Sequence, residues 1–148
     1  MTPSKFNIRA YMILLHEGKI LIADERIKGS SYIKLPGGGL EFGEGPRDCI
    51  LREAQEELGQ EVEVLHHVHT TEMFVQSKFY PTDQVVAIYY QVQLKEDPTF
   101  RVSEEKHDFQ GTGEDEESFR WVDWDDLKTN DLSFETDRAV IRQLKMED

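Results

Sequence analysis

Three glutamates, Glu53, Glu56 and Glu57, stand close together in the segment "REAQEELG". In a helix, this i, i+3, i+4 spacing places all three carboxylates on one face. Like charges at that spacing cost a few tenths of a kcal/mol, and acids near a helix C-terminus also oppose the helix dipole. Side chains placed against such local preferences often mark functional sites. The simpler alternative is that these glutamates form a solvated acidic face.

A divalent cation would relieve the repulsion between these glutamates. Carboxylate oxygens are the ligands that hard cations such as Mg²⁺ and Mn²⁺ prefer. Gly37, Gly38 and Gly39 precede the glutamates, and a glycine turn can offer carbonyls to a metal or N–H groups to a phosphate. We therefore predict a Mg²⁺ site, with Mn²⁺ as a substitute, beside a bound phosphate.

The glutamates need a helix to hold them, and the sequence supplies its ends. Pro46 suits the first turn of a helix and Gly59 suits its C-terminal stop, so we expect a helix over residues 46–58. The residues expected to face the core are Ile50, Leu51, Ala54 and Leu58. The single cysteine, Cys49, is expected to be a packed side chain rather than a nucleophile.

The rest of the chain alternates between strand-like and helix-like patterns. We expect a hairpin that turns near Glu17-Gly18, a short strand over Tyr32–Leu35 that stops at Pro36 and the glycines, and strands over 61–75, 85–94 and 119–122. Residues 95–118 are expected to be a long acidic surface loop, and residues 123–128 a short helix. A last amphipathic helix is expected over 133–148, with Ala139, Ile141 or Val140, and Leu144 inward. This order predicts a mixed α/β domain with short sheets flanked by helices.

Length and charge narrow the function classes. A chain of 148 residues is expected to form one domain over residues 1–148. A net charge of −13 disfavours long nucleic acids, although a metal would let a small phosphorylated ligand bind. We expect no membrane partner and no signal peptide, and a chain with one cysteine fits a cytoplasmic location. The oligomeric state is left open between a monomer and a homodimer.

The spacing of the glycines and glutamates carries a family resemblance. The segment from Gly38 to Gln60 resembles the Nudix box, G-x5-E-x7-R-E-U-x-E-E-x-G-U, in which U is an aliphatic residue. The matching positions are Gly38, Glu44, Arg52, Glu53, Glu56, Glu57 and Gly59. The last aliphatic position is the one departure, because Gln60 stands there.

The resemblance implies a Nudix-type α/β/α sandwich with a mixed sheet, in which the box forms a loop–helix–loop. It also implies Mg²⁺-dependent hydrolysis of a pyrophosphate bond in a nucleoside diphosphate linked to another moiety X, such as a nucleotide sugar or a nucleoside triphosphate. By that resemblance Glu53, Glu56 and Glu57 would ligate the metal. Arg52 would orient Glu53, which acts as the catalytic base in some members.

The resemblance implies supporting residues as well. Glu44 would support the loop or bind an outer metal, and a carbonyl of Gly37 or Gly38 would be a further metal ligand. Family members often add an acid from a distal loop, and the candidates here are Glu114, Glu116 and Glu117, with Glu104, Glu105 and Asp115 less favoured. The residues expected to contact substrate phosphates are Gly37, Gly38, Arg9 and Lys34.

Several alternatives remain open at this point. The cluster His66, His67 and His69 could bind a metal, but an exposed strand edge is the simpler interpretation. The chain could be an idle Nudix-like domain that senses a nucleotide, or an acidic protein-interaction module. Residues after the box give no signature of one substrate subtype, so the nucleobase and X stay open.

Overall fold

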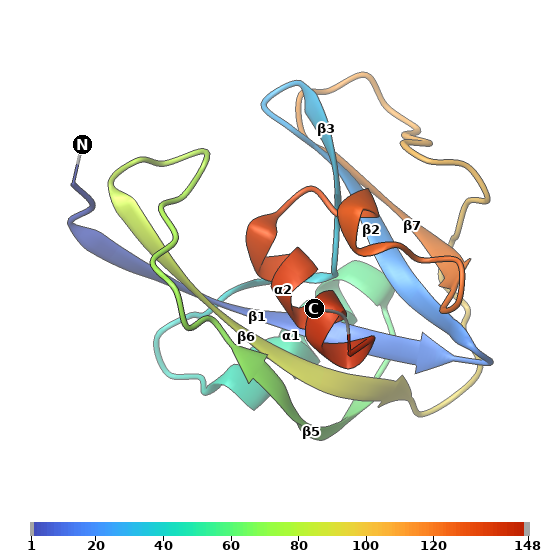
Figure 1. Cartoon of the computed structure of the whole chain (residues 1–148). Coiled ribbons are helices and arrows are strands. Elements are labelled where there is room, and N and C mark those ends of the chain that lie inside the picture. The colour runs from blue at the N-terminus through green and yellow to red at the C-terminus, as the bar shows by residue number, and fades with distance from the viewer. Residues whose placement is uncertain (1, 147–148) are drawn as a thin grey trace.

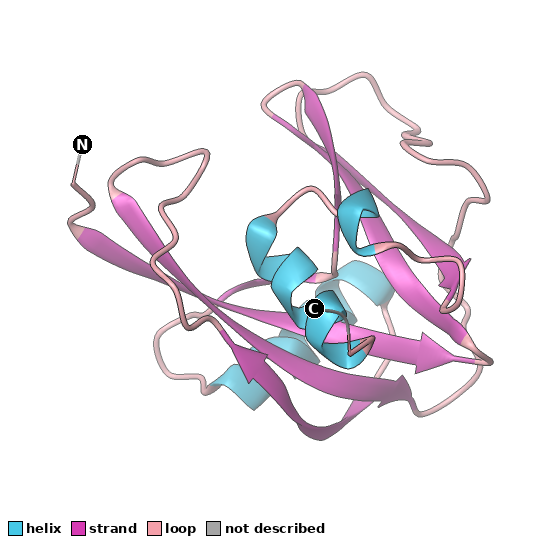
Figure 2. Ribbon diagram, in the orientation of Figure 1, coloured by secondary structure: helices cyan, strands magenta, loops and turns pink. Residues whose placement is uncertain are grey.

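The computed structural model describes residues 2–146, in which four strands precede the first helix and three strands precede the second (Figures 1 and 2). The elements are β1 (Lys5–His16), β2 (Lys19–Ile27), β3 (Ser30–Lys34), β4 (Gly37–Gly39), α1 (Pro46–Leu58), β5 (Val62–Thr70), β6 (Asp83–Leu94), β7 (Glu116–Asp123), a 3₁₀ turn η1 (Thr129–Asp131) and α2 (Glu135–Leu144). No helix within residues 2–146 is long and apolar enough to cross a membrane.

Strand β1 is shared between two parts of a mixed sheet. Its length from Lys5 to Leu14 pairs in parallel with β6, and only its last two residues, Leu15 and His16, pair with β2. Beyond that hairpin, β2 leaves β1 and pairs with β3 and β7 (Figure 1). The hairpin turn is confirmed, and the split creates an opening between the two parts of the sheet.

The two helices cover opposite faces of β1, because side chains alternate along a strand. Ala10, Met12 and Leu14 pack in one apolar cluster with the core-facing residues of α1. Tyr11 and Ile13 pack in a second cluster with Val140 and Ile141 of α2. The predicted α/β/α arrangement with a mixed sheet is therefore confirmed.

Several expected elements are wrong in detail. Residues 37–39 form strand β4, paired with Arg9–Tyr11 of β1, instead of a turn. The expected helix over 123–128 is absent, and only the 3₁₀ turn η1 follows. The strand expected over 61–75 is shorter, since β5 ends at Thr70. The segment that follows β5 returns to β6 through an isolated bridge between Gln76 and Gln84.

Two further corrections affect the site. Leu51, expected in the core, is 46% exposed, and Glu53 is buried in α1 instead, at 8% exposure. Glu116 and Glu117, expected in the loop, belong to β7, so the loop covers residues 95–115. The last helix ends at Leu144, and the expected residues 147–148 lie outside the described part of the chain.

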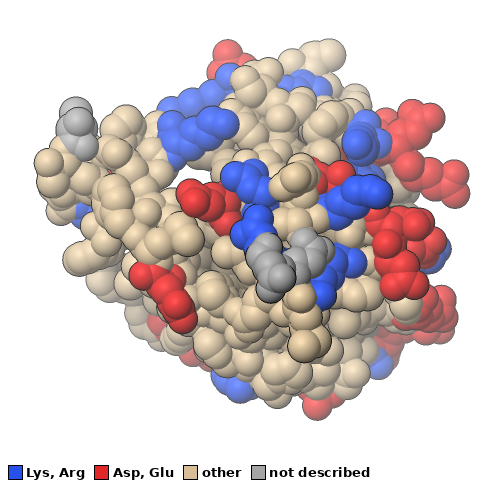
Figure 3. Space-filling view, in the orientation of Figure 1, with Lys and Arg blue, Asp and Glu red and all other residues tan. Residues whose placement is uncertain are grey.

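The surface charge is uneven. Acidic side chains crowd the right-hand edge of the face in Figure 3, where Figure 1 places the loop between β6 and β7. Lys and Arg side chains gather nearer the middle of the same face. A strongly acidic chain therefore still presents basic groups where an anionic ligand could approach.

Candidate active site

Helix α1 carries the predicted glutamates and has well-defined ends. Its N-cap is Gly45, whose backbone N–H donates to Asp48 Oδ2 at 2.8 Å, and Pro46 occupies the first turn. Its C-cap is Gly59, whose φ of 66° lies in the left-handed region that glycine adopts without strain. The helix expected over residues 46–58 is therefore confirmed, and its register on the sheet is fixed by its buried apolar residues.

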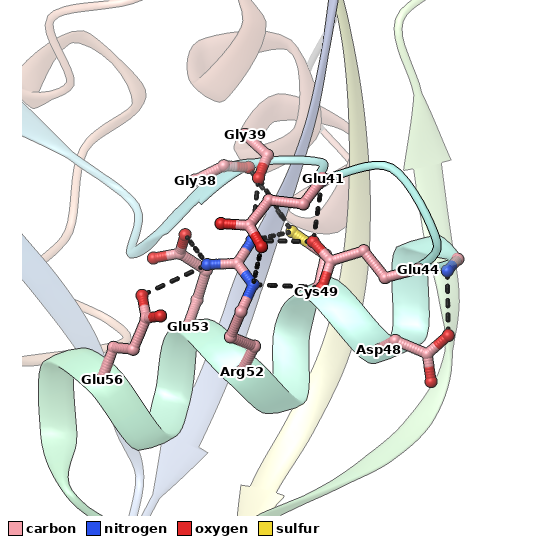
Figure 4. Close-up of polar contacts among 10 residues, drawn as sticks. Gly38, Gly39, Glu41, Glu44, Asp48, Cys49, Arg52, Glu53 and Glu56 are labelled. Carbon is pink, nitrogen blue, oxygen red and sulfur yellow. Dashed lines mark hydrogen bonds and ion pairs between the residues drawn. The ribbon is translucent and has the colours of Figure 1, made fainter.

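Arg52 binds three of the box carboxylates, as Figure 4 shows. Its guanidinium donates to both oxygens of Glu44 at 3.0 and 2.7 Å, to Glu53 Oε1 at 3.0 Å and to Glu56 Oε2 at 3.2 Å. It also donates to the Gly39 carbonyl at 2.9 Å. We call these residues the Arg52 network. The positive charge of Arg52 thus offsets much of the repulsion that the sequence suggested among the glutamates of α1.

The electrostatics of the Arg52 network follow from these contacts. Hydrogen bonding from Arg52 lowers the pKa of Glu44 to about 2, despite the opposing effect of desolvation. The same bond to Glu44 is the largest cause that raises the pKa of Arg52. Glu44 and Arg52 are therefore both charged at neutral pH and paired with each other.

The glycines of β4 let the helix approach the sheet closely. A Cβ on Gly38 would collide with the Glu53 carboxylate, and a Cβ on Gly37 would collide with the backbone of Ala10 and Tyr11. The carbonyls of Gly38 and Gly39 face the thiol of Cys49 at 3.7 and 3.6 Å. Glycine at position 38 therefore sets how deeply Glu53 can sit. Cys49 is buried, as expected, and desolvation raises its pKa to about 11.

A second group of carboxylates surrounds Lys34. Glu57 of α1 and Glu117 of β7 each have one buried oxygen, Oε2, with no hydrogen-bond partner. Glu25 of β2 lies opposite Glu117 in the β2–β7 ladder, and its Oε2 is 3.8 Å from Lys34 Nζ. We call Lys34, Glu25, Glu57 and Glu117 the Lys34 network.

Two carboxyl groups of the Lys34 network, those of Glu57 and Glu117, have raised pKa values. Desolvation, the charge of Glu117 and a contact with Glu53 raise the pKa of Glu57. Desolvation and the charge of Glu25 raise the pKa of Glu117, although Lys34 acts against both. These two half-buried carboxyl groups, each with an unpartnered oxygen, can be satisfied by protons or by a further cation.

A pocket of about 650 Å³ adjoins the Lys34 network. Lys34, Glu25 and Glu117 line it, together with Arg9 and Tyr11 of β1. Other lining residues are Phe79 and Phe134, which also pack against the Tyr32 ring. A pocket of this size, lined by apolar rings and convergent charged groups, is typical of small-molecule sites.

Arg9 is a half-buried basic group of the pocket. Its Nε donates to the Tyr11 hydroxyl at 2.5 Å, and its Nη1 lies near Gly39. Within residues 2–146 it forms no ion pair with a carboxylate. The charge of Arg9 is therefore available to an anionic ligand.

The structure brings some predicted residues together and leaves others apart. Glu117 lies beside Glu57, and Glu116 lines the pocket but packs beneath Gly111 of the long loop. Glu114 does not line the pocket and uses its carbonyl to accept the N–H of Gly29. The histidines of β5 lie elsewhere, where His67 contacts Thr70 and His69 contacts Gln143.

Two pocket residues were missed by sequence reasoning. Glu25 lies in the strand-like segment "ILIADERI" with no motif around it, and only its pairing with Glu117 brings it to the site. Asp137 is 2% exposed at the start of α2, and its carboxylate accepts from the Leu35 N–H at 3.1 Å and from the Tyr89 hydroxyl. The signal available in the sequence was the position of Asp137, an acid three and four residues before the apolar Val140 and Ile141, on the face of the helix expected to point inward.

The acids fit a divalent cation, although they are not preassembled around one. Within residues 2–146 no three His, Cys, Asp or Glu side chains form a ready metal cage, since Arg52 holds Glu53 and Glu56. The unpartnered oxygens of Glu57 and Glu117 nevertheless lie in a carboxylate-rich, buried setting. Oxygen donors of this kind suit Mg²⁺ or Mn²⁺ and not a soft metal.

The family model for the NUDIX domain matches residues 5–144, almost the whole chain. The chain belongs to the Nudix family. It is a Nudix hydrolase, and members of this family act on small nucleotide-type substrates. The resemblance seen between Gly38 and Gln60 is therefore confirmed at the level of the family.

Solved structures share the fold of this Nudix chain. A MutT NUDIX hydrolase from Burkholderia pseudomallei is 19% identical, with a TM-score of 0.70, and the match covers 95% of this chain and 99% of that one. A NUDIX hydrolase from Nitrosomonas europaea is 17% identical, with a TM-score of 0.70 over 96% and 90%. An ADP-ribose pyrophosphatase from Streptococcus suis is 18% identical, with a TM-score of 0.59 over 96% and 93%.

Proposed function

We propose that this Nudix hydrolase cleaves a pyrophosphate bond in a nucleoside diphosphate linked to another moiety, and that it depends on Mg²⁺. The observation that carries the proposal is the pair of buried, unpartnered oxygens of Glu57 and Glu117 beside a pocket that holds Arg9 and Lys34. Carboxylate oxygens without a hydrogen-bond donor, next to a guanidinium without a carboxylate partner, suit a metal together with a phosphate. The cytoplasmic location and the choice between monomer and homodimer stay predictions.

Glu53, Glu56, Glu57 and Glu117 are the proposed metal ligands, with Glu44 and a carbonyl of Gly37 or Gly38 in supporting positions. A bound Mg²⁺ would polarise the phosphate oxygens and acidify a water. Glu53 is buried and held by Arg52 through Oε1, and its carboxylate would accept a proton from the attacking water. Arg52 fixes the orientation of that carboxylate.

The basic groups of the pocket have a different task. Arg9 and Lys34 would bind the phosphate oxygens and hold the scissile bond over the glutamates. The aromatic side chains Phe79 and Phe134 give the pocket an apolar wall suited to a ring of the substrate. Neither group forms a covalent bond, because water is the nucleophile.

A turnover screen tests this function. Nucleotide sugars and other nucleoside diphosphate-X compounds are incubated with Mg²⁺ or Mn²⁺, and a phosphatase then releases phosphate from the monoester products. For nucleoside triphosphates, a pyrophosphatase is used instead and converts the released pyrophosphate to phosphate. We expect at least one compound to be cleaved, and Glu53→Gln to lose about 10²–10⁴-fold in rate. Tight nucleotide binding with no turnover across the panel would instead favour the nucleotide sensor.

A further inference from the structure

Lys34 is a buried cation surrounded by acids. It is 5% exposed, its Nζ lies 3.8 Å from Glu25 Oε2, and it lies 5.5 Å from the centre of the Tyr11 ring. A lysine is almost never buried so completely unless its charge is paired. The burial of Lys34 therefore requires the carboxylates around it.

The acids that depend on Lys34 come from four elements. Glu25 is on β2, Glu57 is on α1, Glu117 is on β7 and Asp137 is on α2. Burial lowers the pKa of Lys34, but the charges of Tyr11, Glu25, Glu117 and Glu57 together raise it. Lys34 pairs with Ala23 of β2, two residues before Glu25, and Glu25 pairs with Glu117 of β7. One ammonium group thus serves several carboxylates.

A single positive charge cannot satisfy this cluster. The contact with Glu25, at 3.8 Å, is too long for a hydrogen bond, and Glu57 Oε2 and Glu117 Oε2 remain unpartnered. Lys34 therefore lies within the field of the same oxygens that we propose as metal ligands. An ammonium group and a divalent cation repel each other when both use these oxygens.

We propose that Lys34 is the internal counter-ion of this carboxylate cluster, and that it opposes divalent metal binding until substrate phosphates attract its ammonium group away. This inference rests on the proposed function and adds the order in which the ligands bind: substrate first makes the metal site stronger. Without substrate, Lys34 weakens the metal site. With substrate, Lys34 turns to the phosphates in the pocket, and metal and substrate then strengthen each other's binding. Such coupling is reciprocal, so either ligand reports it.

Direct metal binding tests the proposal without turnover. Free Mn²⁺ is measured by electron paramagnetic resonance in the intact protein, with and without the non-hydrolysable α,β-methylene ADP. We expect Lys34→Met to bind Mn²⁺ on the order of tenfold more tightly without nucleotide. The gain in Mn²⁺ affinity on adding nucleotide should shrink in Lys34→Met and persist in Lys34→Arg.

The matched control is Lys95→Met. Lys95 also pairs with a glutamate, Glu61, at 3.5 Å, but that pair is exposed and belongs to other elements. Its removal should leave Mn²⁺ affinity unchanged. Circular dichroism checks folding, and Lys34→Gln replaces Lys34→Met if the latter does not fold.

The outcomes separate the two proposals. Equal Mn²⁺ affinity in wild type and in the Lys34 variants overturns the counter-ion, even if the wild type hydrolyses a substrate. Equal tightening in Lys95→Met overturns it as well, because the effect would then be general. Tightening confined to the Lys34 variants supports the counter-ion even if the turnover screen finds no substrate.

Discussion

The Arg52 network and the Lys34 network each place glutamates around one basic side chain, but they differ in how many of their charged groups have a hydrogen-bond partner. Arg52 donates five hydrogen bonds of 2.7–3.2 Å to Glu44, Glu53, Glu56 and Gly39. Lys34 has one long ion pair, and two neighbouring carboxylates keep an unpartnered oxygen.

The difference follows from the chemistry of the two cations. A guanidinium presents five donors in a rigid plane and can bridge several carboxylates, whereas an ammonium is a point charge on a flexible stem. The Arg52 network is therefore complete within the protein and can hold the box in shape. The Lys34 network is incomplete and lies on the pocket, where a ligand can finish it.

The largest expected effect is on turnover. Glu57→Gln removes a carboxylate of the incomplete network, and we expect its turnover to fall about 10³-fold, which corresponds to roughly 4 kcal/mol of transition-state stabilisation. Steady-state kinetics on the substrate found by the screen measures this. The comparison variant is Glu56→Gln, which changes another proposed metal ligand; its side chain is 58% exposed and already paired with Arg52, so we expect a smaller loss. A larger loss in Glu56→Gln would reverse the roles given to the two networks.

The next effect is stabilisation by metal. Mg²⁺ at 100 times its dissociation constant should raise the free energy of unfolding by about 2.7 kcal/mol, because only the folded chain assembles the ligands. Thermal unfolding with Mg²⁺ and with a chelator measures the shift. We expect Glu117→Gln to reduce it strongly and Glu114→Gln to leave it unchanged. A full shift in Glu117→Gln would remove Glu117 from the metal site.

Removing the complete network should cost stability even without metal. Arg52→Met leaves the Glu44 and Glu53 carboxylates without their main donor, and we expect the unfolding midpoint to fall by roughly 5 °C. Calorimetry in the presence of a chelator measures this. Arg47→Met is the control, because Arg47 is on the same helix and makes one 3.4 Å contact with the Val64 carbonyl. Equal midpoints in the two variants would contradict the structural role of Arg52.

The smallest effect is on pH dependence. The pKa of Glu57 is raised by desolvation and by Glu117, so the folded state binds more protons than the unfolded state above the ordinary pKa of 4.5. The contribution of Glu57 to the stability of the metal-free protein is therefore fully present below that pH and is lost as pH rises through the raised pKa. Urea unfolding with a chelator from pH 5 to pH 8 should show a flatter profile for Glu57→Gln than for wild type. Parallel profiles would show that Glu57 titrates normally.

The sequence predicted the helix that carries the glutamates, with its two ends. The interval from Gly38 to Gly59 lies in one loop and helix, so its spacing alone fixes which carboxylates share a face. The buried position of Glu53 escaped prediction because it depends on how closely β4 lets the helix approach. Leu51 looked like a core residue by periodicity, but the stripe on α1 is narrower than the pattern suggested.

The long-range parts could not be read from one segment. Glu25 and Glu117 meet only because β2 pairs with β7, and neither strand carries a motif that specifies this pairing. Three glycines have no strand propensity, so the sequence predicts a turn where β4 lies. Only pairing with β1 extends these residues into a strand. Residues 123–128 have a helix-like start but too few apolar positions to hold a helix on the core.

The parallel pairing of β1 with β6 also constrains how the chain is made. Lys5 finds its partner at Asp83, so the middle of the sheet cannot close until β6 has left the ribosome. Pairings this distant in sequence are slow to form, and until then the apolar stretch from Met12 to Leu14 has an open edge. Early synthesis is therefore the stage at which this protein most needs protection from aggregation.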